Sequence, residues 1–437
     1  MEPSKAVSII DAAVPLFFVL IALEIAVACI TRRRVYRLND SIADLALGAV
    51  SQLAGLWTKI PILVGFAVIG EYFSLQSLLG VASIPERALV TESGFDWVAA
   101  VWWSAAFVLL DHQYYWGHRF THQVNLAWAG HVAHHSSEEY NLAVALRQSA
   151  TQSLFTMWFY FPVAILGFTW FHYVVCMGIN LLYQFWVHTR LVGRLGPFEW
   201  VMNTPSHHRV HHGRDPKYID KNHAGVFIVW DRLYKTFQVE EEEPNYGITS
   251  PLLSHNPVWS NLQHYAVVWR TFCRARGARD KLRALFGKTG WKPDYTSGAP
   301  APLTRGKGRD KYDPQVPRSI QIYAVAHFGA AVLFMLAVTT RAASAHGLEY
   351  WLVVAGALFT VFSFSNVAGM FDRRSWIATA ETIRLAFMVV SGIALAATGG
   401  MAPLWGWLIA GLGAASLGIL ASQREQLDKV LLQPGNR

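Results

Sequence analysis

The stretch DHQYYWGHRFTH, residues 111–122, lies at the end of an apolar run that begins near residue 96. Its two histidines, His118 and His122, are four residues apart, and residues with this spacing share one face of a helix. Two imidazoles on one face can point at a common ion. The stretch therefore predicts a metal site at the end of a membrane helix.

Two more histidine motifs repeat a related spacing. HVAHH at residues 131–135 and HRVHH at residues 208–212 each place imidazoles at positions i, i+3 and i+4. One such triplet alone could be an exposed surface, but two identical triplets with further histidines favour a metal centre. Imidazole suits zinc, copper, iron and nickel, and one tetrahedral zinc needs about four ligands, so this set suggests two metals. The candidate ligands are His118, His122, His131, His134, His135, His188, His208, His211 and His212.

The composition indicates an integral membrane protein. The chain has 437 residues, of which 53% are hydrophobic and 14% aromatic. Apolar runs recur along the chain, and most are long enough to cross a hydrocarbon core of about 30 Å. Two runs, at 154–171 and 172–187, are short and nearly contiguous. The runs lie near residues 7–30, 44–72, 96–116, 154–171, 172–187, 319–339, 350–371, 376–398 and 402–421. The predicted fold class is an all-α polytopic membrane protein with about nine transmembrane helices and a cytoplasmic histidine-rich di-metal cap.

Basic residues give the expected orientation. Arg32–Arg37 follow the first apolar run instead of preceding it, so this run is expected to stay as an anchor and not to be a cleaved signal. Basic segments mark the cytoplasmic side, which places Arg32–Arg37, Arg270–Arg318 and Arg373–Arg374 there. Nine crossings satisfy this with the N-terminus outside and the histidines inside. We expect an integral protein of the inner (plasma) membrane, if bacterial, with its active site on the cytoplasmic face.

The net charge of +8 does not point to nucleic acid. The excess is concentrated between Arg270 and Lys311, next to a membrane segment, and attraction to anionic lipid headgroups explains it. The three cysteines are scattered and form no C-x-x-C, so neither a disulfide framework nor a thiolate metal site is expected. Metal ligands must then come from histidine.

The chain changes character near residue 318. Residues 1–318 hold all the chemical motifs and form the expected catalytic domain, and residues 319–437 form a group of four apolar helices. Within this second group, Glu381 and Arg384 are spaced to pair with each other, because charges inside a membrane are costly unless matched. His327 is interpreted as a packing residue.

The motifs together resemble a known family. The stretches at residues 111–122, 131–135 and 208–212 resemble the histidine boxes of the fatty acid hydroxylase and sterol desaturase superfamily. The flanking stretches WAGHVAHHSSEEYNL (128–142), YQFWVHT (183–189) and NTPSHHRVHHGRDPKYIDKN (203–222) are similar to the branch of alkylglycerol monooxygenase and its bacterial relatives. The resemblance covers about residues 40–240.

This resemblance implies a centre of two iron ions, held by the nine histidines, that activates O2 to hydroxylate or desaturate a lipid chain. For the branch it implies oxidation of the carbon beside an ether oxygen, with a reduced pterin such as tetrahydrobiopterin as the electron donor. Gln184 stands where wider superfamily members often have histidine, and a glutamine there can orient a water on the metal. Asn222 matches the family as a supporting group. Imidazole ligands usually donate their second N–H to a carboxylate or carbonyl, and the candidate acids are Asp111, Glu138, Glu139 and Asp220.

The chain departs from the branch at two positions. Branch members tend to carry a glutamate directly after the histidine that matches His122, where this chain has Gln123. The electron donor is therefore either a pterin or a redox protein. Gln123 is the candidate cofactor contact. Lys235 replaces a glycine, a change in local turn chemistry. His112, His207 and His223 adjoin the motifs but break the spacing, and are interpreted as spare.

Other functions remain open on the residues alone. A zinc-dependent membrane hydrolase would need an open metal position and a nearby general base. A metal or lipid transporter would carry its ligands near the middle of the bilayer, whereas these motifs lie at helix ends. The histidines do not separate desaturation from hydroxylation, and the lipid substrate is undetermined.

Overall fold

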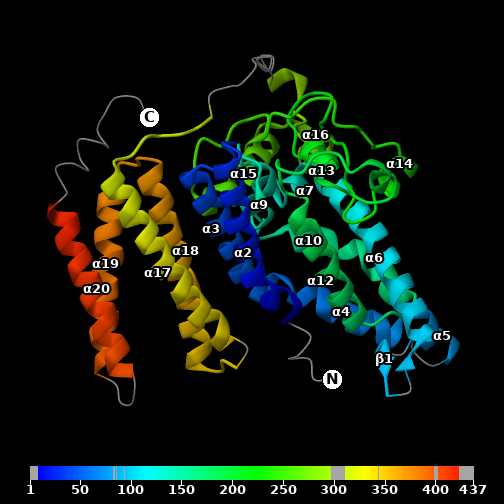
Figure 1. The fold of residues 1–437 in the computed structure, drawn as a ribbon, viewed down its shortest axis with the longest axis horizontal. Coiled ribbons are helices and arrows are strands. Elements are labelled where there is room, and N and C mark those ends of the chain that lie inside the picture. The colour runs from blue at the N-terminus through cyan, green and yellow to red at the C-terminus, as the bar shows by residue number, and fades with distance from the viewer. Residues whose placement is uncertain are drawn as a thin grey trace. The chain divides into compact units, whose positions relative to one another are not determined.

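The protein is mostly helical, as the sequence predicts (Figure 1). The computed structural model describes residues 8–81, 84, 86–92, 94–296, 311–342, 344–397 and 402–422. A single two-stranded antiparallel hairpin interrupts the helices of this described part, with β1 (Val90–Thr91) paired to β2 (Gly94–Phe95). The all-α prediction is therefore confirmed apart from this short hairpin.

The chain forms two compact units. The first comprises Met1–Leu252 and Trp259–Lys311, and the second comprises Leu253–Val258 and Tyr312–Arg437. A short segment from the middle of the sequence thus belongs with the C-terminal helices. The division into a catalytic part at residues 1–318 and a helical part at residues 319–437 stays a prediction, and the last residues of the second part lie outside the described residues.

The first unit is built from long helices that carry short helices at one end (Figure 1). The longer helices are α2 (Ser8–Ile30), α3 (Leu38–Thr58), α4 (Ile60–Tyr72), α6 (Trp97–Gln123), α12 (Trp170–Trp186), α15 (Pro257–Arg274) and α16 (Gly277–Phe286). The short elements are α5 (Leu75–Leu79), α7 (Asn125–Ala129), α8 (Val132–His135), α9 (Leu142–Ala145), α10 (Gln152–Thr156), η1 (Met157–Phe159), α11 (Phe161–Ile165), η2 (Gly196–Trp200), α13 (Pro205–His211), α14 (Val229–Leu233) and η3 (Asp294–Thr296).

The second unit contains four long helices that run side by side: α17 (Arg318–Ala342), α18 (Leu348–Phe371), α19 (Ile377–Ala396) and α20 (Ala402–Ser422). Glu381 and Arg384 form the predicted pair, with Arg384 Nε donating to Glu381 Oε2 at 2.8 Å. His327 Nδ1 lies 2.8 Å from Arg384 Nη2, and its Nε2 lies 3.1 Å from Ser416 Oγ. These contacts fit its interpretation as a packing residue.

Asp372 holds the separate segment Leu253–Val258 within the second unit. Its buried carboxylate accepts hydrogen bonds from Ser254 Oγ at 2.6 Å and from the His255 backbone N–H at 2.9 Å, and it lies 2.7 Å from His255 Nδ1. A buried carboxylate needs several donors, because an unpaired charge away from water is costly. The segment therefore has a specific anchor at the end of α18.

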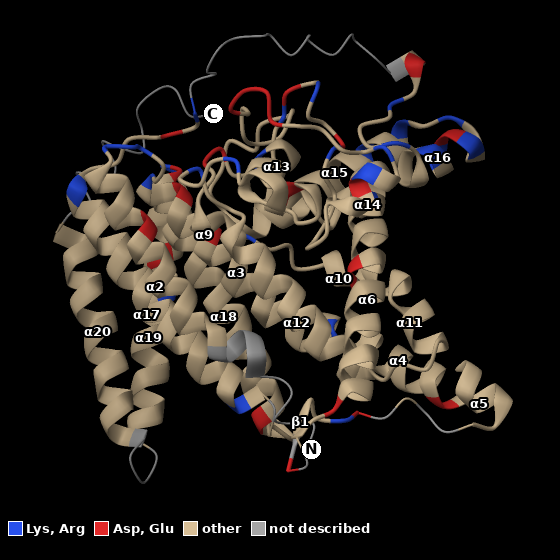
Figure 2. Cartoon of the chain, turned by 45° about the vertical axis from the view of Figure 1, so that its right-hand side comes forward, with Lys and Arg blue, Asp and Glu red and all other residues tan. Residues whose placement is uncertain are grey.

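The helices support an integral membrane protein. Six stretches of the described chain are long and apolar enough to cross a bilayer, by length and composition. They are Ala13–Ile30, Leu38–Leu79, Arg318–Ala342, Leu348–Phe371, Ile377–Ala396 and Pro403–Ser422. Figure 2, in which the ribbon is coloured by residue type, shows that charged residues are sparse along these helices.

The count of nine crossings is not confirmed. The predicted run at residues 96–116 does form a long helix, α6, and the run at 172–187 forms α12, although neither is among the six stretches. The run at 154–171 is not one helix but is divided among α10, η1 and α11. Pro162 lacks an N–H for a preceding turn, and Gly167 has a φ of 91°, which ends the helix.

An apolar core fixes α6 against α4, α11 and α12. Phe66, Leu110, Tyr160 and Val163 are buried together there, and the rings of Phe66 and Tyr173 lie 4.8 Å apart. The burial of large apolar side chains stabilises this packing by about 1.5–3 kcal/mol for each side chain. The core therefore sets the position of α6, whose other end carries His118 and His122.

A buried ion pair joins α3 to the segment after α9. Arg147 Nη1 lies 3.0 Å from Asp44 Oδ1, and both side chains are buried. Arg147 also donates from Nε to the Ala133 carbonyl at 2.7 Å and from Nη2 to Ser136 Oγ at 2.7 Å. The guanidinium therefore ties α3 to the short helix α8, which carries two histidines.

We expect Arg147→Ala to lower the free energy of unfolding by about 3–5 kcal/mol, because it leaves the Asp44 carboxylate buried without its cation. The measurement is thermal unfolding of the detergent-solubilised protein. The double variant Arg147→Met with Asp44→Asn leaves no unpaired charge and should recover part of the loss. Equal stability of wild type and Arg147→Ala would contradict the assignment.

Candidate metal centre

The nine predicted histidines meet at one end of the first unit. His118 and His122 lie on one face of the last turns of α6. The second motif forms α8 with His131 just before it, and the third forms α13 with His212 directly after it. His188 follows the end of α12. All nine side chains are buried.

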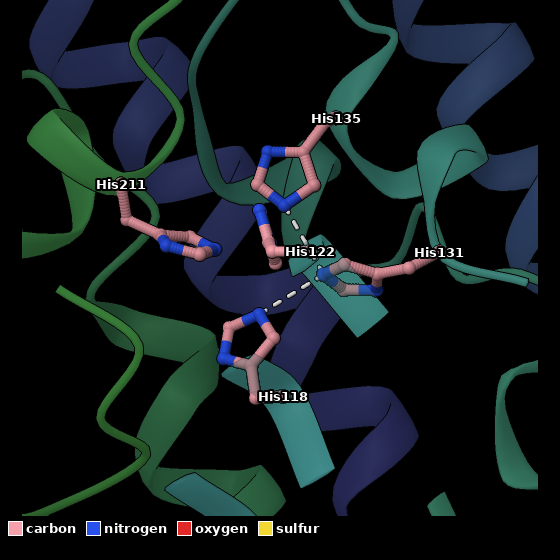
Figure 3. Close-up of side chains that lie close together, drawn as sticks. All are labelled: His118, His122, His131, His135 and His211. Carbon is pink, nitrogen blue, oxygen red and sulfur yellow. Dashed lines mark hydrogen bonds between the residues drawn. The ribbon is translucent and has the colours of Figure 1, made fainter. Parts of the chain in front are cut away.

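The histidines form two groups. The first contains His118, His122, His131, His135 and His211, and the second contains His134, His188, His208 and His212. One ring nitrogen of each histidine lies within 4.8 Å of those of the other members of its group. Figure 3 shows the five rings of the first group turned toward a common point. Segments far apart in the sequence therefore converge in the way that the spacing predicts.

Backbone carbonyls orient four of the nine rings. Four Nδ1 atoms lie within hydrogen-bond distance of carbonyl oxygens: His118 with His223 at 2.8 Å, His134 with Arg147 at 2.7 Å, His188 with Gln184 at 2.7 Å and His211 with Lys221 at 3.0 Å. A carbonyl only accepts, so each of these rings carries its proton on Nδ1. Their Nε2 atoms are left with a free lone pair, which is the form that binds a metal.

The inner nitrogens fit a metal. His118 Nε2 and His135 Nε2 lie 2.9 and 3.1 Å from His131 Nε2, and in the second group His208 Nε2 lies 3.1 Å from His188 Nε2. Two nitrogens that bind one ion at about 2.1 Å and at roughly right angles are about 3 Å apart.

Several buried nitrogens are also unsatisfied. Nε2 of His122, His211 and His212 has no hydrogen-bond partner among the described residues. A buried polar atom without a partner is costly, and such atoms in a native structure point to a missing water or ion. Each group could therefore hold one ion.

Burial keeps these rings neutral. It lowers the pKa of His134 to about 4. Burial, followed by the neighbouring imidazoles, also holds the pKa of His135 and His212 well below the ordinary value. Neutral imidazole is the ligand form, so at pH 7 these rings are ready to bind a cation without first losing a proton.

Gln184 and Asp111 belong to one buried network between α6 and α12. Gln184 Oε1 accepts from the Tyr114 hydroxyl at 2.8 Å, and its amide donates to Asn180, whose own amide donates to Asp111 Oδ1 at 2.7 Å. The Gln184 side chain is thus engaged by protein groups, while its backbone carbonyl holds His188. The water-orienting role predicted for it stays a prediction.

Asp111 also anchors the loop that follows the third motif. Its carboxylate accepts from the backbone N–H groups of Val226 and Phe227 at 2.8 and 3.0 Å and from Trp230 Nε1 at 2.8 Å. A Cβ added at Gly225 would lie 2.8 Å from Asp111 Oδ1, so the loop can approach this closely only with glycine there. Asp111 therefore supports the loop and orients none of the nine rings directly.

Asn222 closes a turn behind α13. It adopts a positive φ of 54°, and its side-chain amide donates to the carbonyls of His207 and Gln238 at 3.0 and 2.8 Å. Its Oδ1 accepts from the Gln238 N–H at 2.8 Å. The structure places it as a support for the third motif, next to Lys221, whose carbonyl orients His211.

The expected carboxylate partners are largely replaced by carbonyls. Glu139 pairs with Arg37 at 2.9 Å and with Lys311 at 2.6 Å, not with an imidazole. Asp220 comes closest, with Oδ1 3.7 Å from His122 Nδ1. Asp111 and Glu139 thus contact other groups, and an acid behind the ligands stays a prediction. Carbonyl acceptors cannot be read from a sequence, because every residue has one.

The remaining predicted residues lie outside the two groups. Gln123 ends α6 and is exposed, so its predicted cofactor contact stays a prediction. His112 bonds to the Tyr234 hydroxyl at 2.8 Å, and His207 lies 3.9 Å from Glu199. His223 is different: it is fully buried, its ring lies 5.0 Å from that of His122, and both its ring nitrogens lack a partner among the described residues.

Sequence reasoning missed two residues that position ligands. Gln152 Oε1 lies 2.9 Å from His131 Nδ1, and Arg147 supplies the carbonyl that holds His134. Arg147 follows α9 and Gln152 begins α10, and neither residue is adjacent in sequence to a histidine or an acid. The text ALRQS at residues 145–149 contains Arg147, whereas Gln152 lies outside it.

Comparison with known proteins identifies the family. A family model described as fatty acid hydroxylase matches residues 103–236. Alkylglycerol monooxygenase from Xenopus tropicalis is 36% identical over 383 residues, which cover 86% of this chain and 80% of that protein. The chain belongs to the alkylglycerol monooxygenase family. The human alkylglycerol monooxygenase is 34% identical over 376 residues, covering 85% of this chain and 80% of that protein.

A less similar relative is named for a different activity. Ornithine lipid hydroxylase OlsE from Rhizobium tropici is 28% identical over 180 residues, covering 39% of this chain and 52% of that protein. No solved structure matches the chain. In this member of the alkylglycerol monooxygenase family, the segment that matches the hydroxylase model contains all nine clustered histidines.

We expect metal analysis of the purified protein to find about two ions for each chain, one for each group of imidazoles. His211→Ala should lower the content through the first group and His134→Ala through the second, because each removes an inward nitrogen. His327→Ala, in the second unit, should leave the content unchanged. Full metal content in the first two variants would refute the ligand assignment.

Proposed function

We propose that the protein is a membrane-bound monooxygenase that uses two iron ions and O2 to oxidise the C–H bond beside the ether oxygen of an alkylglycerol. The observation that carries the proposal is the pair of buried imidazole groups, which lie within the segment matched by the hydroxylase model. The relatives named alkylglycerol monooxygenase support the substrate class.

The reaction balances with a two-electron donor. One oxygen atom of O2 enters the C–H bond, and the other leaves as water with two electrons and two protons from the donor. The hydroxylated carbon then carries both a hydroxyl and an ether oxygen, so it is a hemiacetal that breaks into an aldehyde and glycerol. Iron bound by the imidazoles would supply the activation of O2 and the oxidation of the C–H bond.

The protein's own residues supply position and a dry site. Each imidazole group draws on three or more separate segments, so the packing of α6, α8, α12 and α13 sets the spacing of the nitrogens. The network from Tyr114 through Gln184 and Asn180 to Asp111 fixes α12 against α6 and so holds His188 in place. A buried, preorganised ligand set spares the site from reorganising during the reaction.

We further propose that the site faces the cytoplasm of the inner (plasma) membrane. Figure 2 shows Lys and Arg gathered at the end of the first unit where the histidine-bearing helices lie, and basic residues favour the cytoplasmic side. The electron donor is proposed to be a reduced pterin such as tetrahydrobiopterin, or else a redox protein. Gln123, exposed at the end of α6, is the candidate contact for it.

A second candidate function is the hydroxylation of another membrane lipid. The match to an ornithine lipid hydroxylase favours it. Desaturation begins with the same hydrogen abstraction and belongs to the same candidate class. A zinc-dependent hydrolase remains the alternative from outside this class, and it would need neither O2 nor a reductant.

We expect membranes that contain the protein to convert a long-chain 1-O-alkylglycerol to the matching aldehyde, with both O2 and a reduced donor required. When the reaction is supplied with 18O2, the labelled oxygen should appear in the aldehyde. The aldehyde must be trapped as it forms, because its oxygen exchanges with water. The matched substrate control is the 1-O-acylglycerol of the same chain length, whose ester lacks the ether carbon. The matched enzyme control is His211→Ala.

Each outcome separates the candidates. Aldehyde from the ether alone supports the proposal. A product heavier by one oxygen from an ornithine lipid or acyl chain supports the second candidate, and a product lighter by two hydrogens supports desaturation. Turnover that persists without O2 would contradict oxidation altogether and favour the zinc-dependent hydrolase.

A further inference from the structure

The outward face of α15 is apolar and aromatic. Trp259, Leu262 and Trp269 are spaced by three and seven residues, so they share one face of the helix. Their exposed fractions are 45%, 51% and 64%. The opposite face is buried although it is polar, with Ser260, Asn261, His264 and Thr271 turned into the protein. This is the reverse of a helix on the surface of a soluble protein, whose apolar stripe faces the core.

The next helix, α16, continues the same pattern. Ala278, Leu282 and Phe286 are spaced by four residues and share one exposed face, where Leu282 is 57% and Phe286 is 60% exposed. Ala284 is fully buried on the inward side. Two successive helices therefore each expose large apolar side chains. We call these residues together the α15–α16 apolar face: Trp259, Leu262, Trp269, Leu282 and Phe286.

Cationic side chains border this face. Arg279 and Arg283 are spaced by four residues next to the stripe of α16, and both are exposed. The one acid of α16, Asp280, accepts from the Tyr295 hydroxyl at 2.8 Å. A shallow concavity is lined by Arg279, Leu282, Arg283 and Phe286. Two guanidinium groups beside two apolar side chains match a phosphate with an attached acyl chain.

We propose that α15 and α16 lie in the surface of the bilayer, with the α15–α16 apolar face among the acyl chains and Arg279 and Arg283 on the headgroup of an anionic phospholipid. An amphipathic helix with tryptophan and basic residues at the edge of its apolar stripe is the pattern of an interfacial helix. Figure 2 marks the basic residues of α16 in blue on the ribbon. This inference is independent of the reaction proposed above.

Hydrogen bonds place the helix pair where α6 leaves its apolar run. Asn125 lies two residues after the end of α6. It donates from Nδ2 to the Ala284 carbonyl at 2.8 Å and from its backbone N–H to the Gly287 carbonyl at 2.9 Å. Its Oδ1 lies 2.9 Å from His264 Nε2 of α15. Both helices are therefore fastened to Asn125, close to the end of α6.

The same helix pair contacts the segment that orients the imidazoles. Asn261 Oδ1 accepts from the Ala150 N–H at 2.9 Å, and the Tyr265 and Thr151 hydroxyls lie 2.7 Å apart. The next residue, Gln152, holds His131, and Thr289 after α16 donates from its hydroxyl to the His122 carbonyl. The segments that hold α15 and α16 are therefore directly connected to the first imidazole group.

The first test measures depth with a nitroxide label on the full chain in nanodiscs. Leu282→Cys carries the label on the apolar face, and Lys281→Cys carries it one position away on the same helix, in a background with Cys29→Ser and Cys273→Ser. We expect the label at 282 to collide several-fold more with O2 than with a water-soluble nickel complex, and the label at 281 to show the reverse. Equal access of the nickel complex to both positions would overturn the proposal.

The second test measures the headgroup contact. Protein from nanodiscs of equal parts phosphatidylglycerol and phosphatidylcholine is released for native mass spectrometry, and retained phosphatidylglycerol is counted. Arg279→Gln with Arg283→Gln should retain several-fold less than wild type. The matched control, Lys217→Gln with Lys235→Gln, removes the same charge outside these helices and should retain the wild-type amount. Equal retention by all three proteins would refute the lipid site.

A protein covering this face would give a different result. If a second copy of the chain occupied it, the label at 282 would be shielded from both O2 and the nickel complex, and two labels in one particle would broaden each other's spectra. That result would overturn the lipid proposal in favour of an interface.

Discussion

Nine imidazole rings can be buried together only if they are uncharged, and a ring is held in place where its outer nitrogen has an acceptor. A protonated imidazole among these neighbours would meet both desolvation and the repulsion of other cations. The structure meets the constraint with carbonyl acceptors behind His118, His134, His188 and His211, which fix the proton on the outer nitrogen. The inner nitrogens then have no proton to donate, so only a cation or a donor can satisfy them.

This constraint explains why supporting residues come from so many segments. The acceptors belong to the loop at His223, the stretch at Arg147, the end of α12 and the turn at Lys221. Each of these segments must be held in its own place. Asp111 holds the first through Val226 and Phe227, and the ion pair with Asp44 holds the second. A substitution at such a support acts on the centre through the backbone, without touching an imidazole.

The sequence was informative where chemistry repeats at a fixed spacing. The helical spacing of His118 with His122, and of the two triplets, was enough to predict that these rings share faces and converge. It could not predict that Arg147 pairs with Asp44, because nothing local links residues that are 103 positions apart. It also misjudged the run at 154–171, where hydrophobicity alone suggested a crossing while Pro162 and Gly167 divide the chain into short helices.

The anchor at Asp372 has a consequence for how the chain can be divided. Leu253–Val258 leads into the start of α15 in sequence but is bound by a carboxylate at the end of α18. A shortened gene that stopped before Tyr312 would still encode this segment, yet it would lack the acid that binds Ser254 and His255. Removing the C-terminal helices would therefore also remove the binding partner of Leu253–Val258. Because the first unit contains residues from both sides of this segment in the sequence, no single truncation point separates the two units.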